Sequence, residues 1–166
     1  MKKKILSLLL SIFVLGIFLL FAVGSGESTT TDQGNGTVEE SLTDSTKLGN
    51  YNIEIKSCRL AKDYDGKDIV IVTYSYTNNS ENPAAFTFTF DDSAFQNGIG
   101  LPKSYFVSDS ANYNSDNQNK EIKKGATLDV EVAYELEDTT SNIEVEVKEL
   151  ISFSDDMVKK TFSLAK

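Results

Sequence analysis

The chain of 166 residues carries 16 Lys and Arg against 25 Asp and Glu, a formal net charge of −9, and contains no His, no Trp and a single Cys. Without His and with one thiol, it can build neither an ordinary zinc site nor a Ser-His-Asp or Cys-His catalytic centre, and no internal disulfide can form. The excess of carboxylates argues against nucleic-acid binding, which needs clustered Lys and Arg to neutralise phosphates. We therefore expect one folded domain without a cofactor, and no activity that can be identified from a short sequence motif.

The chain opens with an export signal. Three lysines follow Met1, and an uncharged apolar run covers residues 5–23, so the positive-inside rule places everything after Gly24 outside the membrane. The 19 residues of the run are enough for a retained helix that anchors the chain in the membrane, whereas the A-x-G sequence that ends at Gly24 suits cleavage and secretion. Both outcomes stay open. Lipoprotein processing is disfavoured because no Cys comes directly after the run, and the single Cys of the chain, Cys58, lies well downstream.

A polar segment follows the export signal. It is rich in Ser, Thr, Gly and acidic residues and holds only three apolar residues, which is too few to bury a core. We predict a disordered tether of the Gly/Ser-rich kind and place the start of the folded domain at Gly49. The predicted organisation is a signal peptide or signal anchor over 1–24, a tether over 25–48 and one domain over 49–166.

After the tether, apolar residues alternate with a period of two, which is the pattern of β-strands. In residues 68–78 both alternating sets begin apolar, which predicts a central strand buried on both faces. In residues 51–60 the apolar positions shift by one after Ile55, as a β-bulge would produce. The dipeptide Asp65-Gly66 between these two strands predicts the tight turn of a hairpin.

Further strands follow toward the C-terminus. Phe86, Phe88 and Phe90 alternate with threonines and predict a third strand with one aromatic face. We expect this face to lie in the core, although an exposed strip for a sugar or a protein partner is the alternative. The polar stretch 108–125 predicts a loop that ends at a turn at Gly125. Strands over 128–136, 143–147 and 157–164 complete about seven, which indicates an all-β, antiparallel sandwich.

Several segments resemble a known family. They are D-Y-D-G-K from Asp63, V-I-V-T-Y-S-Y-T-N-N-S from Val70, A-F-Q-N-G-I from Ala94, and I-K-K-G followed by V-A-Y-E-L near Tyr134. The chain resembles domain-of-unknown-function family 5067 (DUF5067) over about residues 51–164. The resemblance implies an immunoglobulin-like fold in an exported protein of Gram-positive bacteria, without an established activity. The signature or structural positions that it implies are Asp63, Gly66, Asn78, Phe95, Gln96, Asn97, Gly98, Gly125 and Tyr134.

Two loops are weighed as binding sites. The carboxylates of Asp63, Asp65 and Asp68 are the ligand type that Ca²⁺ prefers, but an alignment of Gly66 with the calcium-loop glycine puts Ala and Val at ligand positions. We therefore favour a plain hairpin turn and expect no metal.

The segment Gln96-Asn97-Gly98 suits either a ligand-recognition loop, since amides both donate and accept, or a turn in which Gln96 satisfies backbone groups. We favour the turn. Cys58 continues an apolar strand face, and we expect a buried, inert thiol.

We predict a non-catalytic immunoglobulin-like module that is displayed or secreted outside the cell and binds an unidentified protein or cell-surface ligand. The alternative is a small exported hydrolase, which would need two carboxyl groups in one cleft and a raised pKa on one of them. A concave pocket with paired acids would favour the hydrolase. Most acids instead occupy alternating strand positions typical of a solvated face, such as Asp129, Glu131, Glu144 and Glu146.

Overall fold

The computed structural model of the chain describes residues 46–165. The predicted export segment 1–24 and the tether up to residue 45 lie outside the described residues. Within residues 46–165, no helix has the length and the apolar character that crossing a membrane requires. The elements are β1 (Thr46–Leu48), β2 (Tyr51–Lys62), β3 (Asp68–Asn78), α1 (Phe86–Thr89), β4 (Phe90–Gln96), β5 (Ile99–Gly100), the 3₁₀ turns η1 (Asp109–Ala111) and η2 (Asp116–Asn119), β6 (Thr127–Glu135), β7 (Ile143–Glu149) and β8 (Val158–Phe162).

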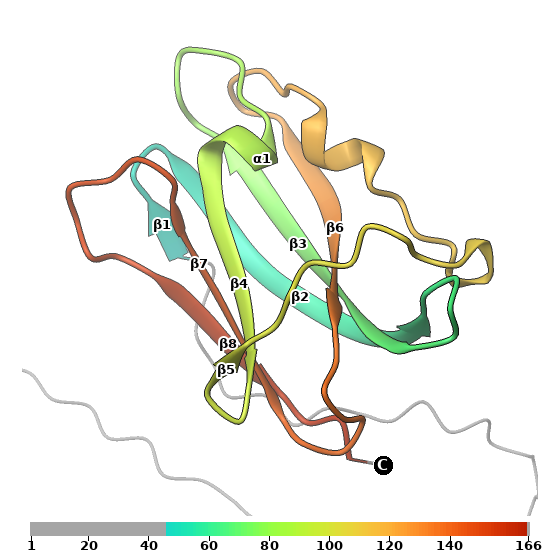
Figure 1. Cartoon of the computed structure of the whole chain (residues 1–166). Helices are drawn as coiled ribbons and strands as arrows, with labels where there is room; N and C mark the ends of the chain where they lie inside the picture. The colour runs from blue at the N-terminus through green and yellow to red at the C-terminus, as the bar shows by residue number, and fades with distance from the viewer. Residues whose placement is uncertain (1–45, 166) are drawn as a thin grey trace, which may run out of the picture. The chain divides into compact units, whose positions relative to one another are not determined.

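Two antiparallel sheets face each other (Figure 1). The first has the strand order β1-β2-β3-β6 and the second the order β5-β4-β7-β8. In the immunoglobulin fold, the strands A-B-E form one sheet and C-F-G the other. The strands β2-β3-β6 and β4-β7-β8 reproduce these two orders. The predicted all-β, immunoglobulin-like sandwich is confirmed, with one strand more than expected in the described part of the chain.

The first sheet is built around β3. This strand pairs with β2 on one side and β6 on the other, and its residues 69–72 are fully buried, which confirms the predicted central strand. The pairing of β2 with β3 shifts register between Ile55 and Ser57, which confirms the predicted bulge. Before the bulge, odd-numbered residues of β2 face the core. After it, the even-numbered Cys58 packs against the core instead.

Residues 86–90 do not form the predicted strand. Phe86–Thr89 make one helical turn, and β4 begins only at Phe90. Phe86 and Phe90 are 1% and 3% exposed and lie in the core, whereas Phe88 is 75% exposed. The reason is helical geometry: residues four positions apart stay on one face of a turn of 3.6 residues, while the residue between them points away. The prediction of one shared core face is therefore wrong for Phe88.

The folded part begins earlier than the predicted boundary at Gly49. Residues Thr46–Leu48, which the sequence analysis placed in the tether, form β1 and pair with Tyr51–Ile53. Leu48 is 1% exposed and belongs to the core cluster. A single leucine in a polar segment gives no strand periodicity, so only the packing reveals its role.

After β5 the chain passes from the second sheet to the first. The backbone N–H of Leu101 donates to the carbonyl oxygen of Ala94 in β4 at 2.8 Å, and that of Ser104 donates to the carbonyl oxygen of Ala133 in β6 at 2.8 Å. The segment that follows occupies the place of strand D of the immunoglobulin fold. It covers a second small core on the outer face of the first sheet, formed by Ile69, Ile71, Val107 and Ala133.

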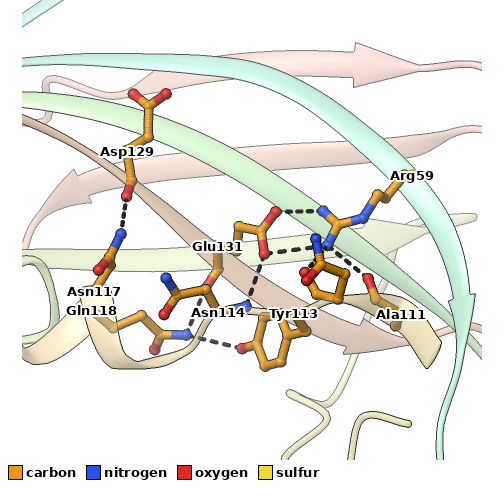
Figure 2. Close-up of polar contacts among 9 residues, drawn as sticks. Arg59, Ala111, Tyr113, Asn114, Asn117, Gln118, Asp129 and Glu131 are labelled. Carbon is orange, nitrogen blue, oxygen red and sulfur yellow. Dashed lines mark hydrogen bonds and ion pairs between the residues drawn. The ribbon is translucent and has the colours of Figure 1, made fainter. Parts of the chain in front are cut away.

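Polar side chains fasten this segment to the first sheet (Figure 2). Arg59 of β2 and Glu131 of β6 form a bidentate ion pair across β3, and the Arg59 guanidinium also donates to the carbonyl oxygen of Ala111 at 3.2 Å. The side-chain amide of Gln118 donates to the carbonyl oxygen of Glu131 at 2.6 Å, in place of the backbone amide that a further strand would supply. These polar groups satisfy one another's hydrogen-bonding capacity, so the cluster holds the segment against the first sheet.

Cys58 is half-buried and free, and burial raises the pKa of its thiol to about 11. The thiolate is the nucleophile in alkylation, so we expect iodoacetamide to modify the folded protein at pH 7.5 at least about tenfold more slowly than the unfolded chain. Intact mass spectrometry over time, with and without denaturant, measures both rates at the single Cys of the chain. Equal rates would contradict the burial of this thiol.

Candidate functional site

The Asp-Gly segment between β2 and β3 is a hairpin turn, as predicted. Gly66 has φ +81°, and its N–H donates to the carbonyl oxygen of Asp63 at 3.2 Å. The Asp63 carboxylate accepts from the backbone N–H of Lys67 at 2.8 Å, and the Asp68 carboxylate forms an ion pair across the hairpin at 2.7 Å, while Asp65 is exposed. Within residues 46–165, no three His, Cys, Asp or Glu side chains are grouped closely enough to hold a metal ion.

Asn78 and Gly125 stabilise the opposite end of the first sheet. The Asn78 side chain is fully buried, and its amide group donates to the carbonyl oxygens of Asn82 and Ile122, both at 2.8 Å. Its oxygen accepts from the backbone N–H and the hydroxyl of Ser80 at 2.8 and 2.7 Å. Gly125 has φ +81°, and its N–H donates to the carbonyl oxygen of Asn78 at 2.6 Å. Both residues form hydrogen bonds with backbone groups, which is a structural role.

Tyr134 belongs to a buried polar network that links the two sheets. Its hydroxyl lies 3.0 Å from that of Tyr74 and donates to the carboxylate of Asp92 in β4. The other oxygen of Asp92 accepts from the ammonium of Lys103 at 2.8 Å. Burial raises the pKa of both tyrosines well above its ordinary value, and the nearby Asp92 adds to the shift. The tyrosines therefore stay protonated and act as structural donors and acceptors between the sheets.

Gln96 is 1% exposed at the end of β4 and binds the turn between β6 and β7. Its Nε2 donates to the carbonyl oxygens of Asp138 and Ser141 at 3.0 and 3.1 Å. Its Oε1 accepts from the backbone N–H groups of Glu137 and Asp138 at 3.0 and 3.1 Å. One amide side chain thus pairs with four backbone groups, which is the geometry of the turn interpretation rather than of a ligand contact.

The residue before Gln96 faces the opposite way. Phe95 lies on the outer face of the second sheet, where it pairs with Gly100 of β5 and with Glu144 of β7, and Glu144 pairs in turn with Thr161 of β8. The Phe95 ring lies against Gly100, since a Cβ placed on that glycine would be 3.6 Å from the ring. All four strands therefore contribute one residue to a row across this face.

Three residues of this row, Phe95, Glu144 and Thr161, form the floor of a hollow of about 350 Å³. The volume lies in the range of small-molecule binding sites. The turn Asn97-Gly98 and the neighbouring Asn142 bound the hollow at one end, and Glu146 follows Glu144 on the same face of β7. The residues that line it are Phe95, Asn97, Gly98, Asn142, Glu144, Glu146 and Thr161.

Lys159 of β8 supplies positive charge beside the hollow. Its ammonium forms an ion pair with Glu146 and lies 4.0 Å from the carboxylate of Glu144. The hydrogen bond to Glu146 raises the pKa of Lys159, so the ammonium stays charged at neutral pH. The hollow therefore combines an aromatic ring, two amides, a hydroxyl and two carboxylates that share one cation.

Sequence reasoning found only part of this site. It singled out Phe95, Asn97 and Gly98, and it assigned Glu144 and Glu146 correctly to the solvated face of a strand. It did not place the acids beside Phe95, because the alternation within a strand gives the face but not the partner strand. Asn142 and Thr161 were missed for the same reason.

A model of the family described as domain of unknown function (DUF5067) matches residues 27–149. The chain belongs to this family. The family resemblance read from the residues is thus confirmed. The DUF5067 match ends with the last residue of β7, so it includes every lining residue of the hollow except Thr161.

Two solved structures resemble this DUF5067 chain. A protein of Staphylococcus aureus subsp. aureus NCTC 8325, described as a candidate lipoprotein, is 18% identical with a TM-score of 0.56, over 77% of this chain and 94% of that chain. A protein of Enterococcus faecalis is 17% identical with a TM-score of 0.53, over 75% of this chain and 92% of that chain. At this identity the likeness shows the fold alone. No protein among those with curated descriptions matches the chain.

The Asn97-Gly98 turn of the DUF5067 protein allows a test of backbone strain. Asn97 and Gly98 have φ of +53° and +78°, the signature of a two-residue hairpin turn. Among the residues that the structure describes, none other than its two chain neighbours has an atom within 4 Å of a Cβ placed on Gly98. Gly98→Val is therefore expected to cost about 1 to 3 kcal/mol of unfolding free energy from strain alone. Denaturant unfolding measures it, with Gly100→Ala, where φ is not positive, as the milder control. A Gly98→Val protein as stable as the wild type would refute the strain.

The hydrogen bonds to the Asp138 carboxylate predict that the stability of the turn after β6 depends on pH. The backbone N–H groups of Ser141 and Thr140 donate to its carboxylate at 2.6 and 2.7 Å and hold its pKa well below the usual range. Stability from this group is full above the unfolded pKa of about 3.9 and falls as the pH drops below it. The melting-temperature gap between wild type and Asp138→Asn should therefore be largest at pH 7 and shrink between about pH 4 and pH 2. A constant gap would contradict this.

Proposed function

We propose that this DUF5067 protein is a non-catalytic binding module that acts outside the cytoplasm, and that its ligand binds in the hollow of the second sheet. The three lysines and the apolar run over residues 5–23 support export. The export segment either anchors the protein in the membrane or is removed near Gly24, and the domain is outside the membrane in both cases. The fold shared with a candidate lipoprotein of Staphylococcus aureus agrees with this location.

The composition of the hollow carries the proposal. Its lining brings together a half-buried aromatic ring, side-chain amides, a hydroxyl and carboxylates on one outer face. Small-molecule sites combine apolar surface with a few placed polar groups in this manner. The ring and the carboxylates stand on paired strands, so the site is preformed and a ligand would lose little affinity to ordering the protein.

Site-specific crosslinking in cells tests the binding site. A photoreactive amino acid at Asn97, on the rim of the hollow, is expected to give a defined covalent adduct on irradiation. The matched control carries the same amino acid at Asp155, an exposed position in the loop between β7 and β8. Adducts at both positions alike, or at neither, would speak against the hollow as the binding site.

Fractionation and intact mass of the native protein test the location and the fate of the export segment. A protein that is retained in the membrane with residues 5–23 present would establish the anchor. Recovery in the medium with Ser25 as the first residue would establish cleavage. Recovery in the cytoplasm would overturn the extracytoplasmic role itself.

One observation favours a second function, an exported hydrolase. Glu144 and Glu146 lie together in a hollow, and paired carboxyl groups in a concave site are the requirement of glycoside hydrolysis. In such a pair one carboxyl group donates a proton to the leaving group, a role that does not fit a carboxylate already held in an ion pair. Lys159 contacts both carboxylates, which is why we place binding first. Release of reducing sugar from cell-wall polysaccharide that is lost in both Glu144→Gln and Glu146→Gln would establish the hydrolase.

A further inference from the structure

The charges of the hollow disfavour a charged ligand. An anion would approach the carboxylates of Glu144 and Glu146 in a chain whose net charge is −9. A cation would have to compete with Lys159, whose ammonium already pairs with both carboxylates. Both approaches therefore cost electrostatic energy that a neutral ligand avoids.

The polar lining disfavours a purely apolar ligand. Such a molecule would cover the carboxylates and the amides without hydrogen bonds to replace those made to water, and the loss of these bonds is costly. The side chains of Asn142 and Thr161 have no hydrogen-bond partner within residues 46–165, so both are available to a ligand. The favoured ligand is neutral, and it both donates and accepts hydrogen bonds.

We infer that the hollow binds a neutral carbohydrate, an inference that rests on the proposed binding function of this site. The hydroxyls of a sugar can donate to the carboxylates of Glu144 and Glu146, and they can pair with the amides of Asn97 and Asn142, which both donate and accept. The C–H face of a pyranose ring can pack on the Phe95 ring, which lies against Gly100 and is half-buried. A volume of about 350 Å³ on an open sheet face suits a short stretch of a glycan chain.

A tryptophan probe tests this in the full chain, held in detergent micelles. The chain contains no Trp, so Phe95→Trp places the sole indole on the floor of the hollow. The probes are chitotetraose, cellotetraose and maltotetraose. At least one of them is expected to shift the emission to the blue in a saturable manner. Phe88→Trp, at an aromatic residue of α1 that is 75% exposed, is the matched control and should not respond.

Two variants in the Phe95→Trp chain then locate the contact. Asn142→Ala and Thr161→Ala each remove one hydrogen bond to the sugar and should raise the half-saturation concentration about threefold to tenfold without changing the melting temperature. Asn52→Ala, at an exposed amide of the first sheet, should leave the half-saturation unchanged. Calorimetric titration of the unmodified chain should give a similar half-saturation, which guards against an effect of the indole itself.

The possible outcomes distinguish a failure of the carbohydrate inference from a failure of the proposed binding site. The inference fails if no neutral oligosaccharide gives a response, if spermidine responds where the oligosaccharides do not, or if Phe88→Trp responds equally. A crosslinked adduct at Asn97 together with no oligosaccharide response would leave the binding function standing and reject the carbohydrate. A sugar response that Asn142→Ala and Thr161→Ala both leave unchanged would place the sugar elsewhere and reject the hollow as its site.

Discussion

Replacing Gln96 with Ala is expected to lower the free energy of unfolding by about 2 to 4 kcal/mol, although the residue belongs to a segment that also suits ligand recognition. The side chain is 1% exposed and makes four hydrogen bonds to backbone groups of residues 137–141. In the variant these groups lose their partner while the protein still shields them in part. Urea unfolding followed by circular dichroism measures the change.

Asn142→Ala is the matched control for this prediction. Asn142 is also an amide at the same end of the second sheet, but it is exposed and has no hydrogen-bond partner within residues 46–165. Its removal should change the unfolding free energy by less than about 0.5 kcal/mol. If Gln96→Ala were equally harmless, the turn would not depend on the Gln96 amide, and the interpretation of Gln96 as a structural residue would have to be abandoned.

A chain that starts at Gly49 is expected to be less stable than one that starts at Ser25, by about 2 to 4 kcal/mol or about 10 °C in melting temperature. The reason is Leu48, which is 1% exposed in the core, together with the pairing of β1 with β2. This reverses the expectation for a tether without contacts. Leu48→Ala in the full chain should account for most of the loss.

A third start point separates packing from chain length. A chain that begins at Thr46 keeps all of β1 and Leu48, so it should match the chain that begins at Ser25 within about 1 kcal/mol. Differential scanning calorimetry compares the three chains. If the start at Gly49 cost nothing, the pairing of Thr46–Leu48 with Tyr51–Ile53 would contribute no stability.

The sequence by itself determined most of the strands, their buried faces and the hairpin turn at Asp65-Gly66. Alternation of apolar residues is a local property with a period of two, so it predicted the central strand at residues 68–78. The dipeptide Asp65-Gly66 likewise predicted the hairpin turn. The shift of the apolar positions by one residue after Ile55 predicted the β-bulge. The family could be recognised for the same reason, since its motifs are runs of neighbouring residues.

The tertiary structure decided the features that depend on which strands pair and pack against each other. Phe86, Phe88 and Phe90 fit a strand by pattern, but packing of Phe86 and Phe90 in one core favoured a helical turn. Leu48 gained its role only by pairing with β2. The same holds for the hollow, because Phe95 and Glu144 are far apart in the chain and meet through the register of β4 with β7. Register is set by burial and turn geometry across the whole sheet, so no local pattern contains it.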